Sequence, residues 1–296
     1  MSFPGINIFS FARRINRPLI LDGAIGSLLQ MQGLNTDEYL WTSLAGVNNQ
    51  EMVIRIHKDY IDAGADIITA NTFRSNPAAV IKSGLSGISS ELLVKRNMDA
   101  AKTARGDEPV LIAGSNAPAE DCYEEKRTLS LKELESNHLN HINLLLLNGA
   151  DFILNETQSH FDEIKIICRY CQKNKIPFVM SLFITNEGRL LSGEKAKDVI
   201  GFILRHGPLA VGLNCISPRI LDSFLSDFQF SSNWGAYLNC GSGNYKDEVI
   251  GCGIDENTYG DIVKKMLPLR PSFIGSCCGS NKGHTKIIRD ILNGLS

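Results

Sequence analysis

The sequence predicts an α/β fold, a (β/α)8 TIM barrel formed by a single domain of residues 1–296. Short apolar, β-branched runs alternate with longer stretches of helical spacing over nearly the whole chain, and there are eight such runs. The runs are almost continuously apolar, which is typical of parallel strands covered on both faces. The length of 296 residues suits such a barrel, and 43% hydrophobic residues provide a large core. A doubly wound open sheet is the alternative arrangement.

Most of the eight predicted strands share one feature, since six of them end in a polar residue or a cysteine. In chain order they are expected at Pro18–Asp22, Asp66–Phe73, Val110–Ser115, Asp151–Glu156, Phe178–Ile184, Ala210–Cys215, Gly235–Cys240 and Ser272–Cys277. In barrels of this class the active site forms at the carboxyl ends of the strands. These strand ends are therefore where functional side chains are expected to meet.

The helices between the strands have recognisable boundaries. Gln50–Ala63 has an apolar face, and Ser130-Leu131-Lys132-Glu133 forms a capping box that begins a helix ending at Asn148-Gly149. The turn Gly23-Ala24-Ile25-Gly26 is expected to begin the helix after the first strand. Further helices are predicted at Phe161–Lys173, Glu194–His206 and Lys282–Leu295, and loops at Ser83–Ser90, Ala117–Thr128 and Gly241–Ile254.

The charge balance and the chain start narrow the function classes. Lys and Arg number 30 against 32 Asp and Glu, so there is no broad basic field of the kind that binds nucleic acid. No apolar run reaches the roughly 18–20 residues of a membrane helix, and the start lacks the basic-then-apolar order of a secretory signal. We therefore expect a cytoplasmic protein with reduced thiols. The charge balance is consistent with small-molecule substrates but does not by itself point to them.

Three cysteines end strands that lie close together in the predicted barrel. Cys215 ends the sixth strand, and the adjacent Cys277 and Cys278 end the eighth. Three thiolates could bind Zn²⁺ and leave a fourth position open, as catalytic zinc sites do. The alternative is that these cysteines are small buried hydrophobic residues. Cys240, at the end of the seventh strand, could be a fourth ligand, and its role is left open.

The other thiols and the histidines carry weaker signals. Cys168 and Cys171 form a C-x-x-C pair, but they share a helix face with Ile164 and Ile167, which favours core packing over redox or metal chemistry. Cys122 and Cys252 fall in predicted loops and have no assigned role. The six histidines lie in helices or near their ends, where we expect solvated or capping roles rather than metal ligation.

Two carboxylates also end strands. Asp22 follows the first strand and Glu156 ends the fourth, so both are expected at the barrel mouth. Two partly desolvated anions suit a substrate ammonium, although Asp22 could instead be a turn residue before Gly23. If Gly23–Gly26 begins a helix, its free N–H groups could hold a carboxylate. Together these features predict a site for an α-amino acid.

The chain resembles the homocysteine S-methyltransferase family over nearly its whole length. The residues that carry the resemblance are Leu21-Asp22-Gly23-Ala24-Ile25-Gly26, Asn71-Thr72-Phe73, Glu156-Thr157, Gly212-Leu213-Asn214-Cys215 and Gly275-Ser276-Cys277-Cys278-Gly279, in the family's order. The resemblance implies a (β/α)8 barrel that binds Zn²⁺ through Cys215, Cys277 and Cys278. It implies that Asp22 and Glu156 hold the amino group of homocysteine and that Asn214 and Asn239 support the site. The expected substrate-binding residues are Asp22, Gly23, Ala24, Ile25, Glu156, Thr157, Asn214 and Asn239.

The resemblance also bears on the methyl donor. The betaine-using branch has a tyrosine near the strand-four glutamate, whereas Thr157 follows Glu156 here, and aromatic faces are what usually hold a quaternary ammonium. Methylfolate-using relatives are commonly one module of a longer chain with cobalamin-binding domains, for which this chain leaves no room after its last helix. We therefore expect a sulfonium donor, S-methylmethionine or S-adenosylmethionine. The segment Ser115–Tyr123 departs from the Gly-Pro-type loop of common sulfonium-using members, which leaves the donor open.

The expected reaction is the formation of methionine from homocysteine; selenohomocysteine would also fit as acceptor. Coordination to Zn²⁺ would ionise the substrate thiol, and a sulfonium leaves as a neutral thioether, so no general acid is needed. Two rivals remain at this point. One is a zinc hydrolase on the same barrel, and the other is a non-enzymatic thiol- or zinc-binding barrel closed by Cys240.

Overall fold

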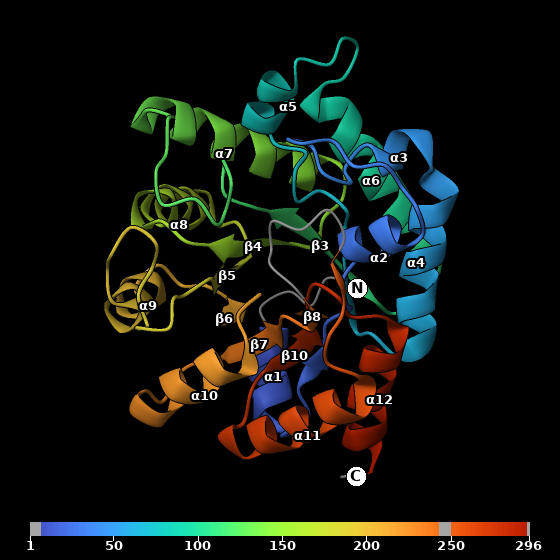
Figure 1. Cartoon of the computed structure of the whole chain (residues 1–296). Coiled ribbons are helices and arrows are strands. Elements are labelled where there is room, and N and C mark those ends of the chain that lie inside the picture. The colour runs from blue at the N-terminus through green and yellow to red at the C-terminus, as the bar shows by residue number, and fades with distance from the viewer. Residues whose placement is uncertain (1–6, 243–249, 295–296) are drawn as a thin grey trace.

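The computed structural model describes residues 7–242 and 250–294, and within them a parallel barrel is surrounded by helices (Figure 1). The predicted helix end at Leu295 and residues 243–249 of the predicted loop Gly241–Ile254 lie outside the described residues. The barrel strands are β1 (Leu19–Ile20), β2 (Ile67–Thr69), β3 (Leu111–Asn116), β4 (Phe152–Gln158), β5 (Phe178–Leu182), β6 (Ala210–Asn214), β7 (Trp234–Leu238) and β10 (Phe273–Ser276). All eight fall on the predicted runs, and the predicted (β/α)8 fold is confirmed.

The order of the strands excludes the alternative open sheet. Successive barrel strands pair in parallel from β2 through β7 to β10, the last strand β10 pairs with the first strand β1, and a parallel bridge between Leu21 and Ile67 joins β1 to β2. A doubly wound sheet would reverse direction partway and leave two edges. Here β7 lies between β6 and β10, as expected for the strands that end in Cys215 and Cys277.

The helices follow the predicted boundaries closely at α4 (Gln50–Ala63), α8 (Phe161–Asn174) and α7 (Leu131–Leu147). The capping box at Ser130 is confirmed, because its hydroxyl accepts from the Glu133 N–H while the Glu133 side chain accepts from the Ser130 N–H. The remaining helices are α1 (Ile8–Arg14), α2 (Gly26–Met31), α3 (Ala45–Asn48), α5 (Pro77–Ser83), α6 (Ser90–Arg105), α9 (Ala196–Leu204), α10 (Pro218–Asp227), α11 (Glu256–Met266) and α12 (Lys282–Asn293). None of the described helices is long and apolar enough to cross a membrane.

Two local predictions need correction. The helix after β1 begins at Gly26 rather than Gly23 and has 6 residues, because the Ala24 N–H and carbonyl bond to the hydroxyls of Ser280 and Tyr60 instead of to helix backbone. The predicted loop Gly241–Ile254 contains a short antiparallel pair, β8 (Gly241–Ser242) and β9 (Gly251–Cys252).

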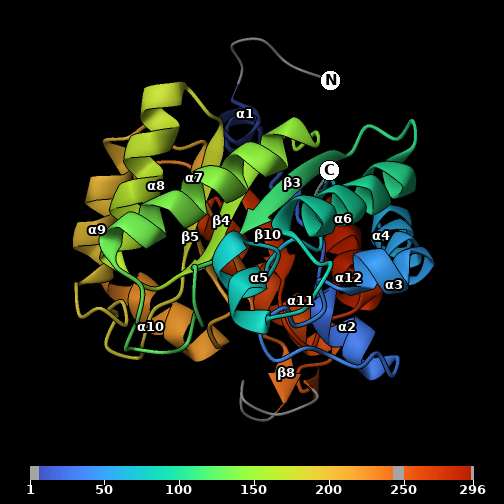
Figure 2. The same ribbon diagram turned by 90° about the horizontal axis from the view of Figure 1, so that it is seen from above.

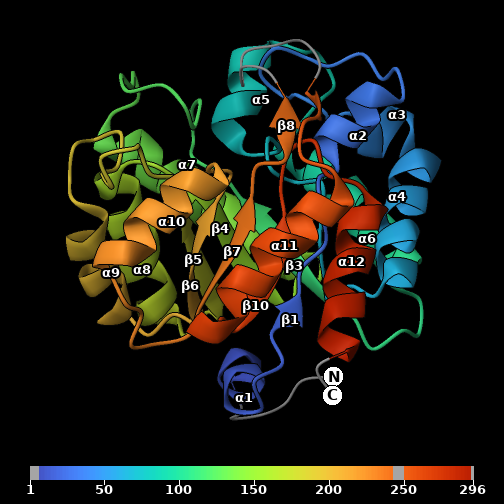
Figure 3. The same cartoon turned by 60° about the horizontal axis from the view of Figure 1, so that its bottom comes forward.

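Helix α1, which the sequence did not predict, closes the amino end of the barrel. Phe9 is buried, and its ring packs edge-on against Phe152 of β4 and Phe273 of β10, with centroids 5.7 and 5.6 Å apart. Figure 2 and Figure 3 show α1 at one end of the barrel and β8 at the other. An apolar plug at the amino end leaves the carboxyl ends of the strands as the side on which a cavity can form.

Candidate functional site

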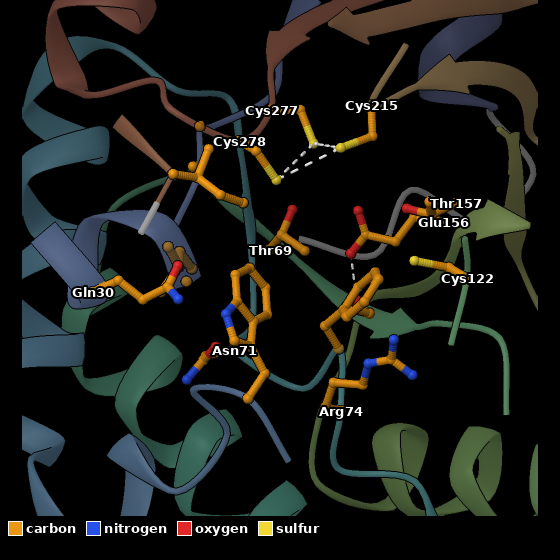
Figure 4. Close-up of a pocket in the computed structure, with 18 of the residues that line it drawn as sticks. Gln30, Thr69, Asn71, Arg74, Cys122, Glu156, Thr157, Cys215, Cys277 and Cys278 are labelled. Carbon is orange, nitrogen blue, oxygen red and sulfur yellow. Dashed lines mark hydrogen bonds between the residues drawn. The ribbon is translucent and has the colours of Figure 1, made fainter. Parts of the chain in front are cut away.

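A cavity of about 340 Å³ lies at the carboxyl ends of the barrel strands, within the size range of small-molecule sites. Most of the predicted site residues line it, and Figure 4 shows how they face one another. The ones that line it are Asp22, Gly23, Ala24, Ile25, Glu156, Thr157, Cys215, Cys277 and Cys278. Asn214 and Asn239 do not.

The structure brings the three strand-end thiols together. The Cys215 Sγ lies 3.1 Å from that of Cys277 and 3.6 Å from that of Cys278, and the last two are 4.0 Å apart. Four ligands around zinc at Zn–S distances near 2.3 Å place sulfur atoms about 3.8 Å apart. In the described part of the chain, this is the one group of three or more His, Cys, Asp or Glu side chains close enough to share an ion. The donor set and its spacing therefore fit a metal with three protein ligands.

Local backbone geometry aims these sulfur atoms. Cys215 has a φ of 55°, in the left-handed region that non-glycine residues seldom adopt, so the chain turns sharply where β6 ends. After Cys278, Gly279 has a φ of 79°, and a Cβ there would lie 2.5 Å from the Gly241 Cα. Only glycine fits this close approach, which keeps Cys277 and Cys278 at the cavity wall.

The cluster also has its own electrostatics. Hydrogen bonds with Cys277 and Cys278 lower the pKa of the Cys215 thiol and raise those of its two partners, and the Tyr123 hydroxyl donates to the Cys215 sulfur across 3.1 Å. Cys240 lies outside the group: its Sγ is 3.5 Å from the Leu238 carbonyl oxygen, and burial raises its pKa. Among the described residues, the structure therefore does not bring Cys240 into the thiol group.

The two carboxylates are buried and have no cationic partner among the described residues. Asp22 accepts from the Thr69 N–H (2.7 Å) and the Thr69 hydroxyl (3.0 Å). Glu156 accepts a short hydrogen bond from the Ser115 hydroxyl and one of 3.3 Å from the hydroxyl of Tyr237. Burial raises the pKa of Glu156 to about 7 and that of Asp22 well above its usual range. A ligand cation in this cavity would offset the cost of burying both charges.

Asn214 lies behind the cavity wall and holds Thr157. Its Oδ1 accepts from the Thr157 N–H (2.9 Å) and from the Ser181 hydroxyl (2.7 Å), while its Nδ2 donates to the Thr157 hydroxyl (2.8 Å). Thr157 has a φ of 56°, an unusual conformation for a β-branched residue, and the register of β4 with β5 shifts here. Asn214 thus fixes the turn that follows Glu156.

Two other predicted residues have different surroundings from those expected. Asn239 accepts from the Gly241 N–H (2.7 Å), so it shapes the turn into β8 rather than the thiol cluster. The Ala24 N–H donates to the Ser280 hydroxyl (3.0 Å), so it is not free to hold a carboxylate. The Gly23–Ile25 turn lines the cavity, but it does not begin a helix.

Several cavity residues were missed by the sequence analysis. The rings of Trp41 and Phe73 lie 6.1 Å apart, and Tyr123 and Tyr237 line the same cavity. The inference that Glu156 has no aromatic neighbour holds along the chain but is wrong in space, because Tyr237 contacts it from β7. Phe73 and Tyr237 lie within predicted strands, and this position could have indicated that they reach the cavity. No sequence pattern indicated this for Trp41.

The remaining cysteines and the histidines differ in burial and in their distance from the cavity. Cys168 and Cys171 are fully buried in the core face of α8, as predicted, and Cys252 is exposed. Cys122, which had no assigned role, lines the cavity. The solvated role expected for the histidines is wrong for most of them: His57, His138, His141, His160 and His284 are buried. His284 does act as a cap, accepting from the Asn281 N–H.

The loop 117–128 after β3, which carries Tyr123, is anchored to the helix layer. Glu163 of α8 is fully buried and accepts from the Ala119 N–H (2.8 Å). The same carboxylate pairs with Arg127 of the loop and lies 2.6 Å from His138 Nε2 of α7. This buried network holds the loop against the barrel, so that Tyr123 reaches the thiol cluster.

Comparisons with known proteins agree with this geometry. The family model described as homocysteine S-methyltransferase matches residues 19–292. Homocysteine S-methyltransferase 2 of Arabidopsis thaliana is 24% identical over 90% of this chain and 91% of its own, and homocysteine S-methyltransferase of Escherichia coli is 27% identical over 67% and 69%. The crystal structure of the metallated E. coli homocysteine methyltransferase MmuM superposes with a TM-score of 0.77 at 23% identity, covering 93% of this chain and 96% of that one.

Proposed function

The chain belongs to the homocysteine S-methyltransferase family, and from this premise we propose that it transfers a methyl group from a sulfonium donor to the thiol of L-homocysteine. The donor would be S-methylmethionine or S-adenosylmethionine. The observation that carries the proposal is a three-thiol cluster that shares one cavity with two buried carboxylates lacking a cationic partner among the described residues. A metal-activated thiol and an ammonium are the two groups that such a cavity would take together.

Cys215, Cys277 and Cys278 would hold Zn²⁺, because their sulfur atoms have suitable spacing and come from fixed strand ends. When bound, Zn²⁺ would lower the pKa of the homocysteine thiol and so provide a thiolate at neutral pH. A site with only thiolate protein ligands also differs from the His and carboxylate sets common in zinc hydrolases, which disfavours that rival.

Asp22 and Glu156 would bind the substrate ammonium. Both carboxylates are buried, so each gains most from a ligand cation that replaces lost hydration. Thr157, Gly23, Ala24 and Ile25 would form the wall around the substrate. Asn214 would act through Thr157 rather than by contact, and Asn239 would act only through the turn into β8.

The reaction balances without a protein acid. A bond forms between the homocysteine sulfur and the methyl carbon, while the bond from that carbon to the donor sulfur breaks and its electron pair stays on the donor. A thiolate and a sulfonium thereby become two neutral thioethers, and the thiol proton goes to solvent. The faces of Trp41, Phe73 and Tyr123 suit a cationic donor. These rings suit a quaternary ammonium equally, so betaine is a second candidate donor.

The direct test supplies homocysteine with each donor in turn and measures the methionine formed. We expect methionine from at least one sulfonium donor, loss of activity on removal of zinc by a chelator, and its return when Zn²⁺ is added. Betaine, assayed in parallel, decides the second candidate. Absence of methionine with both sulfonium donors, or full activity in protein shown to be metal-free, would contradict the proposal.

A further inference from the structure

The charged residues of the cavity are strongly unbalanced. Five carboxylates line it, those of Asp22, Asp37, Glu38, Asp121 and Glu156. Among the described lining residues, Arg74 is the sole Lys, Arg or His. Homocysteine and an amino-acid sulfonium together bring two ammonium groups and one sulfonium but also two carboxylates. The cations find several partners in this cavity, whereas a carboxylate finds a single cationic one.

Arg74 is placed to bind a ligand while it is held in position. Its Nη1 donates to the Glu120 carbonyl oxygen (2.6 Å), and its Nη2 lies 3.6 Å from Asp121 Oδ1. Its side chain is 14% exposed, and its guanidinium lies 5.5 Å from the centre of the Phe73 ring. A guanidinium has five N–H groups, and these contacts engage only part of them. The pair with the half-exposed Asp121 is weak enough to open for a ligand.

The position of Arg74 separates it from the homocysteine site. Figure 4 shows the three thiols at one side of the cavity and Arg74 at the opposite side, with Glu156 between them. Phe73 precedes Arg74 in the chain, and its ring packs against Trp41. A donor whose methyl group faces the thiols and whose sulfonium lies near these rings would therefore direct its remaining chain toward Arg74.

We propose that Arg74 binds the carboxylate of the methyl donor, with Asp121 receiving the donor ammonium, so that this pair selects an amino-acid sulfonium. The inference rests on the proposed function and adds a specificity-determining residue to it. Charge-assisted hydrogen bonds to a planar guanidinium are among the strongest polar contacts that a carboxylate makes.

The test compares S-methylmethionine with its methyl ester, which keeps the sulfonium and the amino group and lacks the carboxylate, at a pH low enough to protonate both amino groups. We expect the wild-type protein to prefer the acid by about tenfold or more in kcat/KM, since a hydrogen bond to a charged group contributes at least this much. Arg74→Ala should remove that preference, chiefly through the KM of the acid. Arg74→Lys should restore part of it, because the charge returns without the two-pronged geometry.

Matched measurements distinguish a role of Arg74 in donor binding from a general loss of folding or of the thiol site. Lys82→Ala removes an exposed cation that lines the neighbouring cavity but not this one, and it should change neither donor's KM. Unchanged zinc content and homocysteine KM in Arg74→Ala would show that the fold and the thiol site persist. Equal losses for acid and ester, or a raised KM for homocysteine instead, would overturn the assignment.

The inference can fail separately from the proposed function. If the wild-type protein methylates homocysteine from a sulfonium but Arg74→Ala keeps the acid-over-ester preference, only the role of Arg74 is wrong. If no methyl transfer occurs, titration calorimetry of S-methylmethionine binding still decides the role. Weaker binding to Arg74→Ala than to the wild type supports it, and equal binding or no detectable binding to the wild type refutes it.

Discussion

The cavity and the layer formed by α7 and α8 contain the same types of residue in opposite surroundings. In the cavity, the Sγ atoms of Cys215, Cys277 and Cys278 lie within 4.0 Å of one another, and their mutual hydrogen bonds lower the pKa of Cys215 while raising those of Cys277 and Cys278. In the helix layer, Cys168 and Cys171 are enclosed by apolar side chains, and burial raises the pKa of Cys171 to about 12. What separates the two sets is arrangement: the three cavity thiols converge on one point where an ion could bind, whereas the helix thiols are packed into the core.

The carboxylates of the two regions show the same contrast. In the part of the chain that the structure describes, Glu156 has hydroxyl partners but no cationic one, and burial raises its pKa to about 7. Burial alone would also raise the pKa of Glu163 in the helix layer, but the hydrogen bond with His138 and the charge of Arg127 lower it. In the helix layer, the buried charge of Glu163 is balanced by partners within the protein. In the cavity, the charge of Glu156 lacks such a partner, and we expect the ligand to provide one.

The largest expected effect separates the two sets of thiols. Cys215→Ala should lower methionine formation more than about a hundredfold and release bound zinc, since even the partners of zinc ligands contribute 10- to 100-fold to metal affinity. Cys168→Ala should leave activity within about twofold and cost roughly 1–2 kcal/mol of unfolding free energy, because it shortens a packed core side chain. Metal analysis, a methionine assay and urea unfolding measure all three quantities. Equal losses of activity in both variants would contradict the different roles of the cavity thiols and the helix thiols.

The next effect separates the two carboxylates. Glu156→Gln should lower kcat/KM for homocysteine by about 2–3 kcal/mol, roughly 30- to 150-fold, because the substrate ammonium loses a charged partner. Glu163→Gln should instead destabilise the fold by about 3 kcal/mol, since it leaves Arg127 and His138 without their buried anion. Steady-state kinetics and urea unfolding on both variants test this exchange of roles. A Glu156→Gln variant with unchanged homocysteine kinetics would contradict the ammonium site.

The contrast explains what could be predicted from the sequence. The eight strands were predictable because each is a local apolar run, and the thiols and carboxylates were predictable because they follow those runs directly. The helix-core role of Cys168 and Cys171 followed from their spacing alone. In each case the signal lies within a few residues of the position that it describes.

Features that depend on distant contacts could not be predicted. Trp41 enters the cavity through loop geometry, and Tyr123 reaches Cys215 because the buried Glu163 anchors its loop. Helix α1 has 7 residues and is stabilised by Phe9, which packs inside the end of the barrel. No local sequence pattern predicts this contact. The buried histidines of α7 were missed for the same reason, since their partners lie on other elements.

A third effect is a difference in how stability depends on pH. Because the folded-state pKa of Glu156 is raised from 4.5 to about 7, its stabilising contribution is complete below pH 4.5 and is lost as the pH rises through 7. Glu163 has a lowered pKa, so its contribution is present above 4.5 and is lost as the pH falls. In metal-free protein, Glu156→Gln should remove up to about 3 kcal/mol of the stability loss between pH 5 and 8. Urea unfolding at pH 5 and pH 8 measures this change in unfolding free energy. If the unfolding free energy of the variant and of the wild type changes equally between the two pH values, the raised pKa of Glu156 is wrong.

The smallest expected effect concerns two buried amides, one behind each region. Asn214 holds the left-handed Thr157 beside Glu156, whereas Asn116 joins Asn155 of β4 to the histidines of α7. Each Asn→Ala change should cost about 1–3 kcal/mol of unfolding free energy, because partners of a buried amide are left unsatisfied. Only Asn214→Ala should also lower kcat/KM for homocysteine, by about tenfold, since a misplaced turn shifts the carboxylate that precedes it. Homocysteine kinetics on both variants, with zinc content as the control, isolate positioning from stability. If the two variants lose activity equally, Asn214 has no role beyond packing and the turn at Thr157 does not position the site.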